Sequence, residues 1–274
     1  MTIDIDQLNT LVRQVGREEL LPRFQRIGHE YKADGSVLTE ADLAVDARLR
    51  EQLHELYPMA AFLSEEMPTA EQKTLLADTA TPLWCLDPLD GTSNFAAGIP
   101  CFGISLALIR DGEVELGIIY DPLRDECFSA QKGRGACLNH RALQAAASGI
   151  GLKRAVAMVD FKRLSPALRR RLVEQPPYSS QRNFGSCALE WGWMAAGRGH
   201  VYLHGGQKLW DLAAGSLILS EAGGTCRTLD GEGIFVPDLA PRSVVSASDP
   251  ALFTAWRDWL AENDRDDPPL MSAN

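Results

Sequence analysis

The stretch LWCLDPLDGTSNF, residues 83–95, decides how the rest of the chain is expected to fold. Its apolar start, residues 83–86, predicts a short buried strand that carries Asp87 and Asp90 into a tight turn. The proline after Asp87 disfavours the helical conformation there, so the backbone stays extended before it bends. Gly91 lets a ligand approach the backbone closely, and the amides that follow it can open a short helix. The turn therefore offers carboxylate oxygens to a cation and N–H groups to an anion, as a metal-dependent phosphate site requires.

A second stretch, WDLAAG at residues 210–215, supplies a further carboxylate, Asp211, and leads to EAGG at residues 221–224. Taken singly, two carboxylates in a turn are ordinary turn formers, and an aspartate at the start of a helix is an ordinary N-cap. Together, the two stretches resemble the Asp-Pro-x-Asp-Gly-Thr-x-Asn-Phe and Trp-Asp-x-Ala-Ala-Gly motifs of the inositol monophosphatase family. The motifs stand in the expected order, more than a hundred residues apart, and the resemblance covers roughly residues 32–248.

The resemblance implies a fold of the α+β or α/β class, the layered α-β-α-β-α sugar-phosphatase fold with two packed subdomains. We expect an N-terminal α+β subdomain over residues 1–147 that carries most of the metal ligands. A C-terminal α/β subdomain over residues 148–274 would contribute Asp211 and the residues on the substrate side. The small-residue-rich stretch 142–151 is the candidate boundary.

Hydrophobic periodicity predicts the elements around the two motifs. Apolar residues recur at helical spacing in the first twenty residues, and a second helix opens at Thr39 and ends at Pro58. Two strand-like runs, 101–109 and 113–120, are joined by a hairpin turn at Asp111-Gly112. The second half alternates between strand and helix: strand 155–159, helix 165–174, helix 189–196, strand 201–203, helix 211–222, strand 243–246 and helix 250–263.

Composition and charge restrict the class of protein. The 274 residues are 45% hydrophobic and 23% charged, which is ordinary for a soluble globular protein. A net charge of −10 without a basic cluster argues against nucleic acid or an anionic membrane as a partner. The chain begins without a signal-like segment, shows no apolar run near the roughly 20 residues of a membrane span, and has scattered cysteines. We therefore expect a cytoplasmic protein with reduced cysteines.

A third acidic position comes from the predicted strand 61–64, which ends in Glu65-Glu66. An acidic doublet is usually a solvated turn, but neighbouring strand ends converge, and Asp87 also lies at a strand end. The doublet is similar to the family's Gly-Glu-Glu, with Ser64 in place of the glycine. The resemblance then implies that Glu65, Asp87, Asp90, Asp211 and the carbonyl of Leu89 hold two or three Mg²⁺ ions, with Glu66 in a supporting role.

The resemblance also implies roles in catalysis. Asp42 lies three residues after Thr39, a spacing typical of a capping box, whereas the family's matching aspartate pairs with the motif threonine, here Thr92. We expect Glu65 and Thr92, oriented by Asp42, to position and deprotonate a metal-bound water. The amides of Gly91, Thr92 and Ser93 would cradle the phosphate, and Asp90 and Asp211 would also contact the substrate.

The substrate itself is left open. Members that hydrolyse inositol phosphates place a glutamate seven residues before the second-motif aspartate, where this chain has His204, expected in a surface loop. Cys187 matches a position that lines the alcohol side. Alternatives to a small polyol or inositol phosphate are histidinol phosphate, which the stretch 32–39 favours, fructose 1,6-bisphosphate and a 3′(2′),5′-bisphosphate nucleotide. A regulatory binding protein with sidelined catalysis is the alternative of another class. The resemblance further implies lithium sensitivity and a homodimer.

Overall fold

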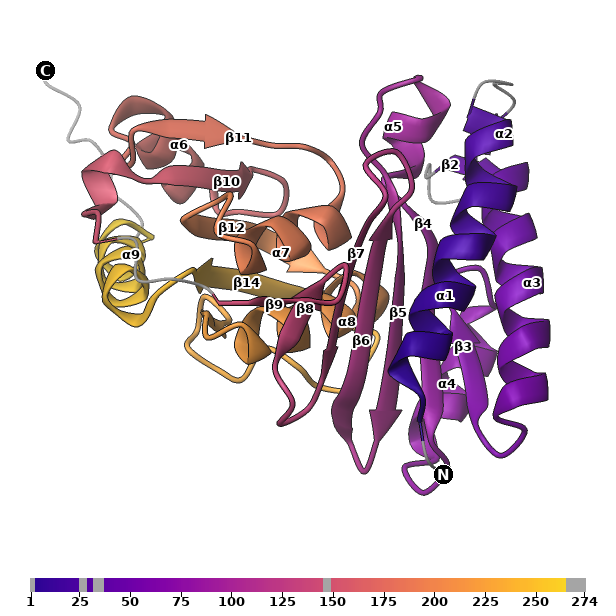
Figure 1. The fold of residues 1–274 in the computed structure, drawn as a ribbon. Coiled ribbons are helices and arrows are strands. Elements are labelled where there is room, and N and C mark those ends of the chain that lie inside the picture. The colour runs from indigo at the N-terminus through magenta and orange to yellow at the C-terminus, as the bar shows by residue number, and fades with distance from the viewer. Residues whose placement is uncertain (1–2, 25–28, 32–36, 145–148, 265–274) are drawn as a thin grey trace, which may run out of the picture.

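Helices and sheets alternate in five layers in the computed structural model, which describes residues 3–24, 29–31, 37–144 and 149–264 (Figure 1). Two helices, α7 (Cys187–Ala195) and α8 (Leu209–Glu221), form the central layer between a seven-stranded and a five-stranded sheet. The outer face of the larger sheet is covered by α1 (Ile5–Val15) and α3 (Glu40–Leu56), and that of the smaller sheet by α6 (Pro166–Glu174) and α9 (Pro250–Asn263). The expected α-β-α-β-α layering is confirmed.

The larger sheet is built around the strand of the first motif. That strand, β4, is buried along all eight residues because helices cover both faces of the sheet. Its neighbour β3 runs parallel to it, and every later strand pairs antiparallel. The predicted hairpin turn is confirmed, with Asp111 and Gly112 at φ values of 52° and 75°. In spatial order the strands are β3 (Ala61–Ser64), β4 (Leu83–Asp90), β5 (Gly103–Arg110), β6 (Glu113–Asp121), β7 (Glu126–Gln131), β8 (Ala136–Leu138) and β9 (Arg141–Leu143).

The smaller sheet comes from the second half of the chain. Its strands β10 and β12 are parallel neighbours, so their carboxyl ends lie at the same edge of the sheet. In spatial order the strands are β11 (Ser180–Arg182), β10 (Val156–Asp160), β12 (Val201–Gln207), β14 (Arg242–Ala247) and β13 (Thr225–Arg227).

The central helix α8 lies unusually close to its neighbours because of its small residues. A Cβ atom built on Gly215 would fall 2.3 Å from Cγ of Trp191 on α7. On the other side, a Cβ atom on Gly117 of β6 would fall 2.7 Å from the backbone oxygen of Ala214. At its last turn, α8 is tied to the turn after β7, where the Glu221 carboxylate accepts the amides of two glycines, Gly133 and Gly135, at 2.8 Å each.

Several elements differ from the sequence-based prediction. β4 runs on to Asp90 instead of stopping at Leu86, and α8 begins at Leu209 instead of Asp211. The prediction missed α4 (Thr69–Ala77), β8, β9, β11 and β13; the missed strands have three residues each, and pairing with a neighbour defines them more than their composition. The other short elements are η1 (Gly16–Leu20), α2 (Leu21–Phe24), β1 (His29–Tyr31), β2 (Val37–Thr39), α5 (Thr92–Ala96) and η2 (Leu152–Arg154).

The expected boundary between residues 147 and 148 falls outside the described residues. Residues 61–143 supply every strand of the larger sheet, and residues 156–247 supply every strand of the smaller one. None of the helices that the structure describes has both the length and the apolar character that a membrane crossing requires.

Candidate metal centre

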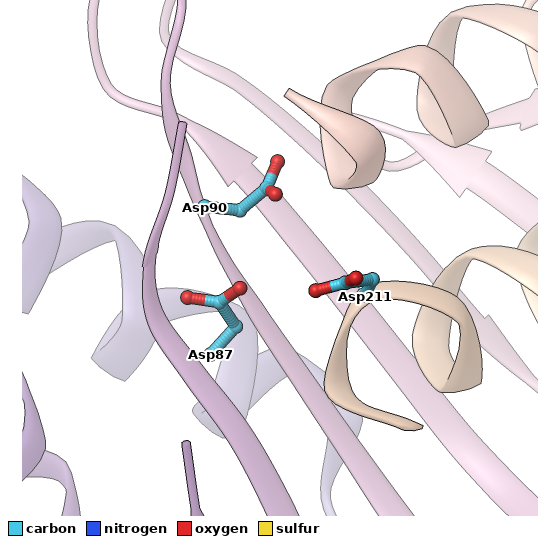
Figure 2. Close-up of side chains that lie close together, drawn as sticks. All are labelled: Asp87, Asp90 and Asp211. Carbon is cyan, nitrogen blue, oxygen red and sulfur yellow. The ribbon is translucent and has the colours of Figure 1, made fainter. Parts of the chain in front are cut away.

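Two buried carboxylates and one partly buried carboxylate, from two distant parts of the chain, meet where the larger sheet faces α8. Asp87 and Asp90 come from the end of β4 and Asp211 from the first turn of α8, and one carboxylate oxygen of each lies within 4.8 Å of the others. Figure 2 shows the three side chains turned toward a common space. We searched the described residues for aspartate, glutamate, histidine and cysteine side chains close enough together to share a metal ion, and these three aspartates form such a group.

A β-bulge brings the two motif carboxylates to the same side of the strand. In a regular strand, residues three apart point to opposite faces. Here Asp87 pairs with Ser105 and Asp90 with Gly103, so three steps along β4 correspond to two steps along β5. The additional residue in β4 reverses the alternation, and both carboxylates turn toward α8 (Figure 2).

The second-motif carboxylate is fixed at the start of α8. Asp211 is not the N-cap but the third residue of the helix, and its Oδ2 accepts the amide of Lys208 at 2.8 Å. The hydroxyl of Ser105, which faces Asp87 across the ladder, donates to the carbonyl of Trp210 at 2.9 Å. This bond joins the start of α8 directly to the sheet that carries the other two carboxylates. The sequence-based prediction missed Ser105, although it is a polar residue among the apolar residues 104–109 of β5.

Burial and mutual repulsion make the centre unfavourable for negative charge. Burial, followed by the charges of Glu65 and Asp90, raises the pKa of Asp87 well above its usual value. Burial, followed by the charge of Asp90, also raises the pKa of Asp211 well above its usual value. Burial raises the pKa of Asp90 to about 6, although hydrogen bonds from Ser186 and from backbone amides lower it in part. A divalent cation would relieve this repulsion, and an all-oxygen donor set suits the hard Mg²⁺ ion.

Glu65 lies at the same end of the sheet as Asp87 but outside the group of three. Its amide donates to the carbonyl of Leu86 at 3.1 Å, and its charge raises the pKa values of both Asp87 and Asp211. Ser64, which replaces the family's glycine, stabilises this turn, because its hydroxyl accepts the amide of Glu66 at 3.2 Å. The missed helix α4 also supports this turn: Gln72, 3% exposed, donates to the carbonyl of Ser64 at 2.8 Å.

Asp42 occupies the capping position and the site at once. Its Oδ2 accepts the amide and the hydroxyl of Thr39 at 2.8 and 2.6 Å, which completes the predicted capping box. Its Oδ1 lies 3.4 Å from the hydroxyl of Thr92. The same hydroxyl is 2.8 Å from the carbonyl of Leu89, which accepts from it. The pairing of Asp42 with Thr92 and the capping role therefore coexist in one carboxylate.

The turn after β4 has the backbone geometry that the sequence indicated. Gly91 adopts a left-handed φ of 88° and caps α5, and a Cβ atom there would fall 2.8 Å from the carbonyl oxygen of Cys101. The amides of Thr92 and Ser93 belong to the first turn of α5, where no intrahelical acceptor is available.

The residues expected on the substrate side lie in or beside the smaller sheet. Cys187 is the first residue of α7, and burial, followed by the charges of Asp211 and Asp90, raises the pKa of its thiol well above the usual value. The thiol is therefore an uncharged neighbour of the centre.

His204 corrects the expectation of a surface loop. It lies within β12, 6% exposed, and pairs with Asp160 of β10 across the ladder. Its Nδ1 accepts the amide of Gly206 at 3.0 Å, and burial lowers its pKa to about 4. The imidazole is thus neutral at physiological pH, with its proton on Nε2, which lies 3.7 Å from Oδ2 of Asp160.

Comparisons with known proteins identify the family of the chain. The model of the inositol monophosphatase family matches residues 5–262. The chain is 34% identical over 215 residues to an inositol-1-monophosphatase of Mesorhizobium japonicum, covering 76% of this chain and 77% of that protein. It is 32% identical over 258 residues to inositol monophosphatase 1 of Bos taurus, covering 90% of each protein. It is also 32% identical over 220 residues to the Nus factor SuhB of Xylella fastidiosa, covering 79% of this chain and 75% of that protein. The solved structure of a Thermotoga maritima IMPase superposes with a TM-score of 0.78 at 25% identity, over 95% of this chain and 99% of that one. The chain belongs to the inositol monophosphatase family of phosphomonoester hydrolases.

Proposed function

We propose that the protein is a Mg²⁺-dependent phosphomonoesterase that hydrolyses a small polyol or sugar phosphate, with an inositol monophosphate as the first candidate. The observation that carries the proposal is the convergence of Asp87, Asp90 and Asp211 within 4.8 Å, in surroundings that raise their pKa values. Such a group is costly to ionise without a cation and well suited to one.

The residues of the centre divide the work of binding. Two or three Mg²⁺ ions would be held by Glu65, Asp87, Asp90, Asp211 and the carbonyl of Leu89, which keeps a lone pair beside the one that accepts the Thr92 hydroxyl. When bound, the metal would lower the pKa of a coordinated water and neutralise the leaving alkoxide.

The protein's own groups would orient the water and the phosphate. The Thr92 hydroxyl donates its proton to the Leu89 carbonyl or to Asp42, so its oxygen is free to accept a hydrogen bond from the attacking water and orient it. Glu65 would take up the proton that the water releases. The amides of Gly91, Thr92 and Ser93 would donate to the phosphate oxygens.

The substrate's alcohol side would be bound by the second half of the chain. Cys187 and His204 are the residues we assign there, together with Asp90 and Asp211 on the metal side. A neutral His204 with a proton on Nε2 can donate to a hydroxyl of a polyol or a sugar, and Asp160 beside it can accept from a neighbouring hydroxyl. Histidinol phosphate, fructose 1,6-bisphosphate and a 3′(2′),5′-bisphosphate nucleotide are the alternative substrates.

Further parts of the proposal follow the family resemblance. We infer two subdomains, residues 1–147 and 148–274, with the metal centre between them. We also infer inhibition by lithium, a homodimer, a cytoplasmic location, and no nucleic acid or membrane as a partner. The net charge of −10 supports the last inference.

A regulatory binding role is the second candidate, because several relatives bear the name Nus factor SuhB. The two candidates differ in what the metal centre must do. A protein that had lost catalysis would tolerate replacement of its ligands, whereas here Asp87, Asp90 and Asp211 are all in place and grouped.

A phosphate-release assay with a panel of esters, with and without Mg²⁺, tests the proposal. We expect Mg²⁺-dependent turnover of at least one small polyol or sugar phosphate, and its loss in Asp90→Asn, whose amide oxygen can still accept from Ser186. Thermal unfolding of the variant confirms that it is folded. Full activity in Asp90→Asn, or turnover that ignores chelation of the metal, would reject the centre as the active site.

A further inference from the structure

A hydrogen-bonded network behind the metal centre determines where Asp90 points. Oδ2 of Asp90 accepts the Ser186 hydroxyl and, at 2.9 Å, the amide of Ala188. Both donors belong to the start of α7, in the other half of the sequence. Because these two donors converge on one carboxylate oxygen, the direction of the other oxygen depends on the position of the turn that precedes α7.

That turn is held at a single residue, Phe184, through both its amide and its carbonyl. The carbonyl of Phe184 accepts the side-chain amide of Asn94 at 2.7 Å, and the amide of Phe184 donates to Oε1 of Glu190 at 2.8 Å. Asn94 also donates to the carbonyl of Cys101 at 2.8 Å, so it belongs firmly to the first-motif turn. Gly185, which lies between Phe184 and Ser186, adopts a left-handed φ of 71° and packs against Asn94.

Glu190 is the acceptor at which a longer chain of hydrogen bonds ends. Trp191 donates to Oε1 of Gln207 at 2.9 Å, the side-chain amide of Gln207 donates to the Tyr202 hydroxyl, and Tyr202 donates to Glu190. Gln207 immediately precedes Lys208, whose amide donates to Asp211. The same network therefore connects the turn that holds Asp90 with the residue whose amide holds Asp211, on the opposite side of the centre.

Packing alone does not account for a carboxylate at this position. Glu190 is 2% exposed on a helix whose other residues are apolar or small, and burial raises its pKa to about 7. The charges of Asp90 and Asp160 add to that cost. An apolar side chain would fill the same space without the cost of burying a charge but would leave the Phe184 amide without its acceptor.

We propose that Glu190 is a positioning residue for the metal ligand Asp90, acting through the Phe184–Ser186 turn, and that Tyr202 orients Glu190 in turn. The inference rests on the proposed metal-dependent function. It assigns to Glu190 an effect on metal affinity and not only on folding. Loss of a group that orients a metal ligand typically weakens metal binding about 10- to 100-fold.

Calorimetric titration of Mg²⁺ into the metal-stripped full-length protein tests the assignment. Glu190→Leu should weaken Mg²⁺ binding by roughly 10-fold or more. Glu190→Gln, which keeps an acceptor for the Phe184 amide, should restore most of the affinity. The matched control is Asp249→Ala, which also removes a buried carboxylate that accepts a backbone amide, at the start of α9. This control should lower thermal stability and leave Mg²⁺ affinity unchanged.

The outcomes separate this inference from the proposed function. If the wild-type protein binds Mg²⁺ and folded Glu190→Leu binds it equally well, the role of Glu190 is wrong and the metal centre stands. If the wild type binds no divalent cation, both proposals fail. Should Glu190→Leu not fold, Tyr202→Phe decides the matter, because it keeps the ring and removes only the donor: a drop of about threefold or more in affinity supports the network, and an unchanged affinity overturns it.

Discussion

Raising the pH should destabilise the metal-free protein through the three carboxyls of its centre. Each has a folded-state pKa above that of the unfolded chain. Over the intervening pH range the folded state keeps a proton that the unfolded state has released, so unfolding releases protons and stability falls as the pH rises. A cation that replaces those protons should reverse the trend.

The magnitude can be worked out for Asp90, whose pKa moves from 3.8 to about 6. At about 1.4 kcal/mol per pH unit, this carboxyl alone costs the folded protein about 3 kcal/mol once the pH exceeds its folded-state pKa. For a chain of this size, that corresponds to a fall of roughly 5–10 °C in melting temperature. Asp87 and Asp211 act in the same direction.

Differential scanning calorimetry in the presence of EDTA measures the effect against a matched variant. Asp90→Asn cannot ionise, so its melting temperature should match that of the wild type near pH 4 and exceed it by roughly 5–10 °C near pH 7.5. Using the difference between the two proteins cancels titrations elsewhere, such as that of Asp125, whose pKa is lowered. With saturating Mg²⁺ the order should reverse. A difference that stays constant across this pH range would refute the argument.

Three further substitutions test separate parts of the structure. Asp87→Asn should reduce turnover by at least about 100-fold and weaken Mg²⁺ binding in a calorimetric titration, since it removes a proposed metal ligand. Thr92→Val should lower kcat roughly 100-fold in a phosphate-release assay at saturating Mg²⁺, because its hydroxyl is proposed to orient the water; an unchanged kcat would exclude that role. Gly215→Ala should destabilise the protein by roughly 1–3 kcal/mol in urea unfolding, because the new methyl group meets Trp191, whereas Gly151→Ala, with no atom within 4 Å, should stay within about 0.5 kcal/mol.

The sequence predicted the elements with strong local signals. The helix over 250–263 has the predicted bounds, and the helix opened by Thr39 ends where Pro58 required. The short strand before Glu65 was also placed correctly at 61–64. In the two helices, periodicity and a cap or a proline point to the same boundary, and the strand is a short apolar run that ends at an acidic doublet.

The features that sequence reasoning missed depend on contacts between distant residues. The spacing of Asp87 and Asp90 would place them on opposite faces of a regular strand, and only the ladder with β5 reveals the bulge. The predicted strand ended at Leu203 with His204 in a surface loop, whereas β12 continues to Gln207 through an irregularity in its pairing. The negative charge of Glu221 is unfavourable at the C-terminal end of its helix dipole. It is compensated by hydrogen bonds from the amides of Gly133 and Gly135, which lie 88 and 86 residues away in the sequence.

The site residues divide in the same way. The motifs pointed to Asp87, Asp90 and Asp211, which the structure groups, while Ser186 and Ser105 had no such signal. Their hydroxyls matter because of what lies opposite them in space. The sequence does not indicate such a residue, because its hydrogen-bond partner comes from the other half of the chain.

The tight seating of α8 on β6 has a consequence for mutations remote from the carboxylates. A methyl group added at Gly117 would meet the backbone of Ala214, and a helix backbone yields as a unit instead of locally. The helix would be pushed off the sheet, carrying Asp211 away from β4. A substitution in the middle of a strand would then have the effect of losing a metal ligand: the proposed activity would require a higher Mg²⁺ concentration although every acidic side chain was still present.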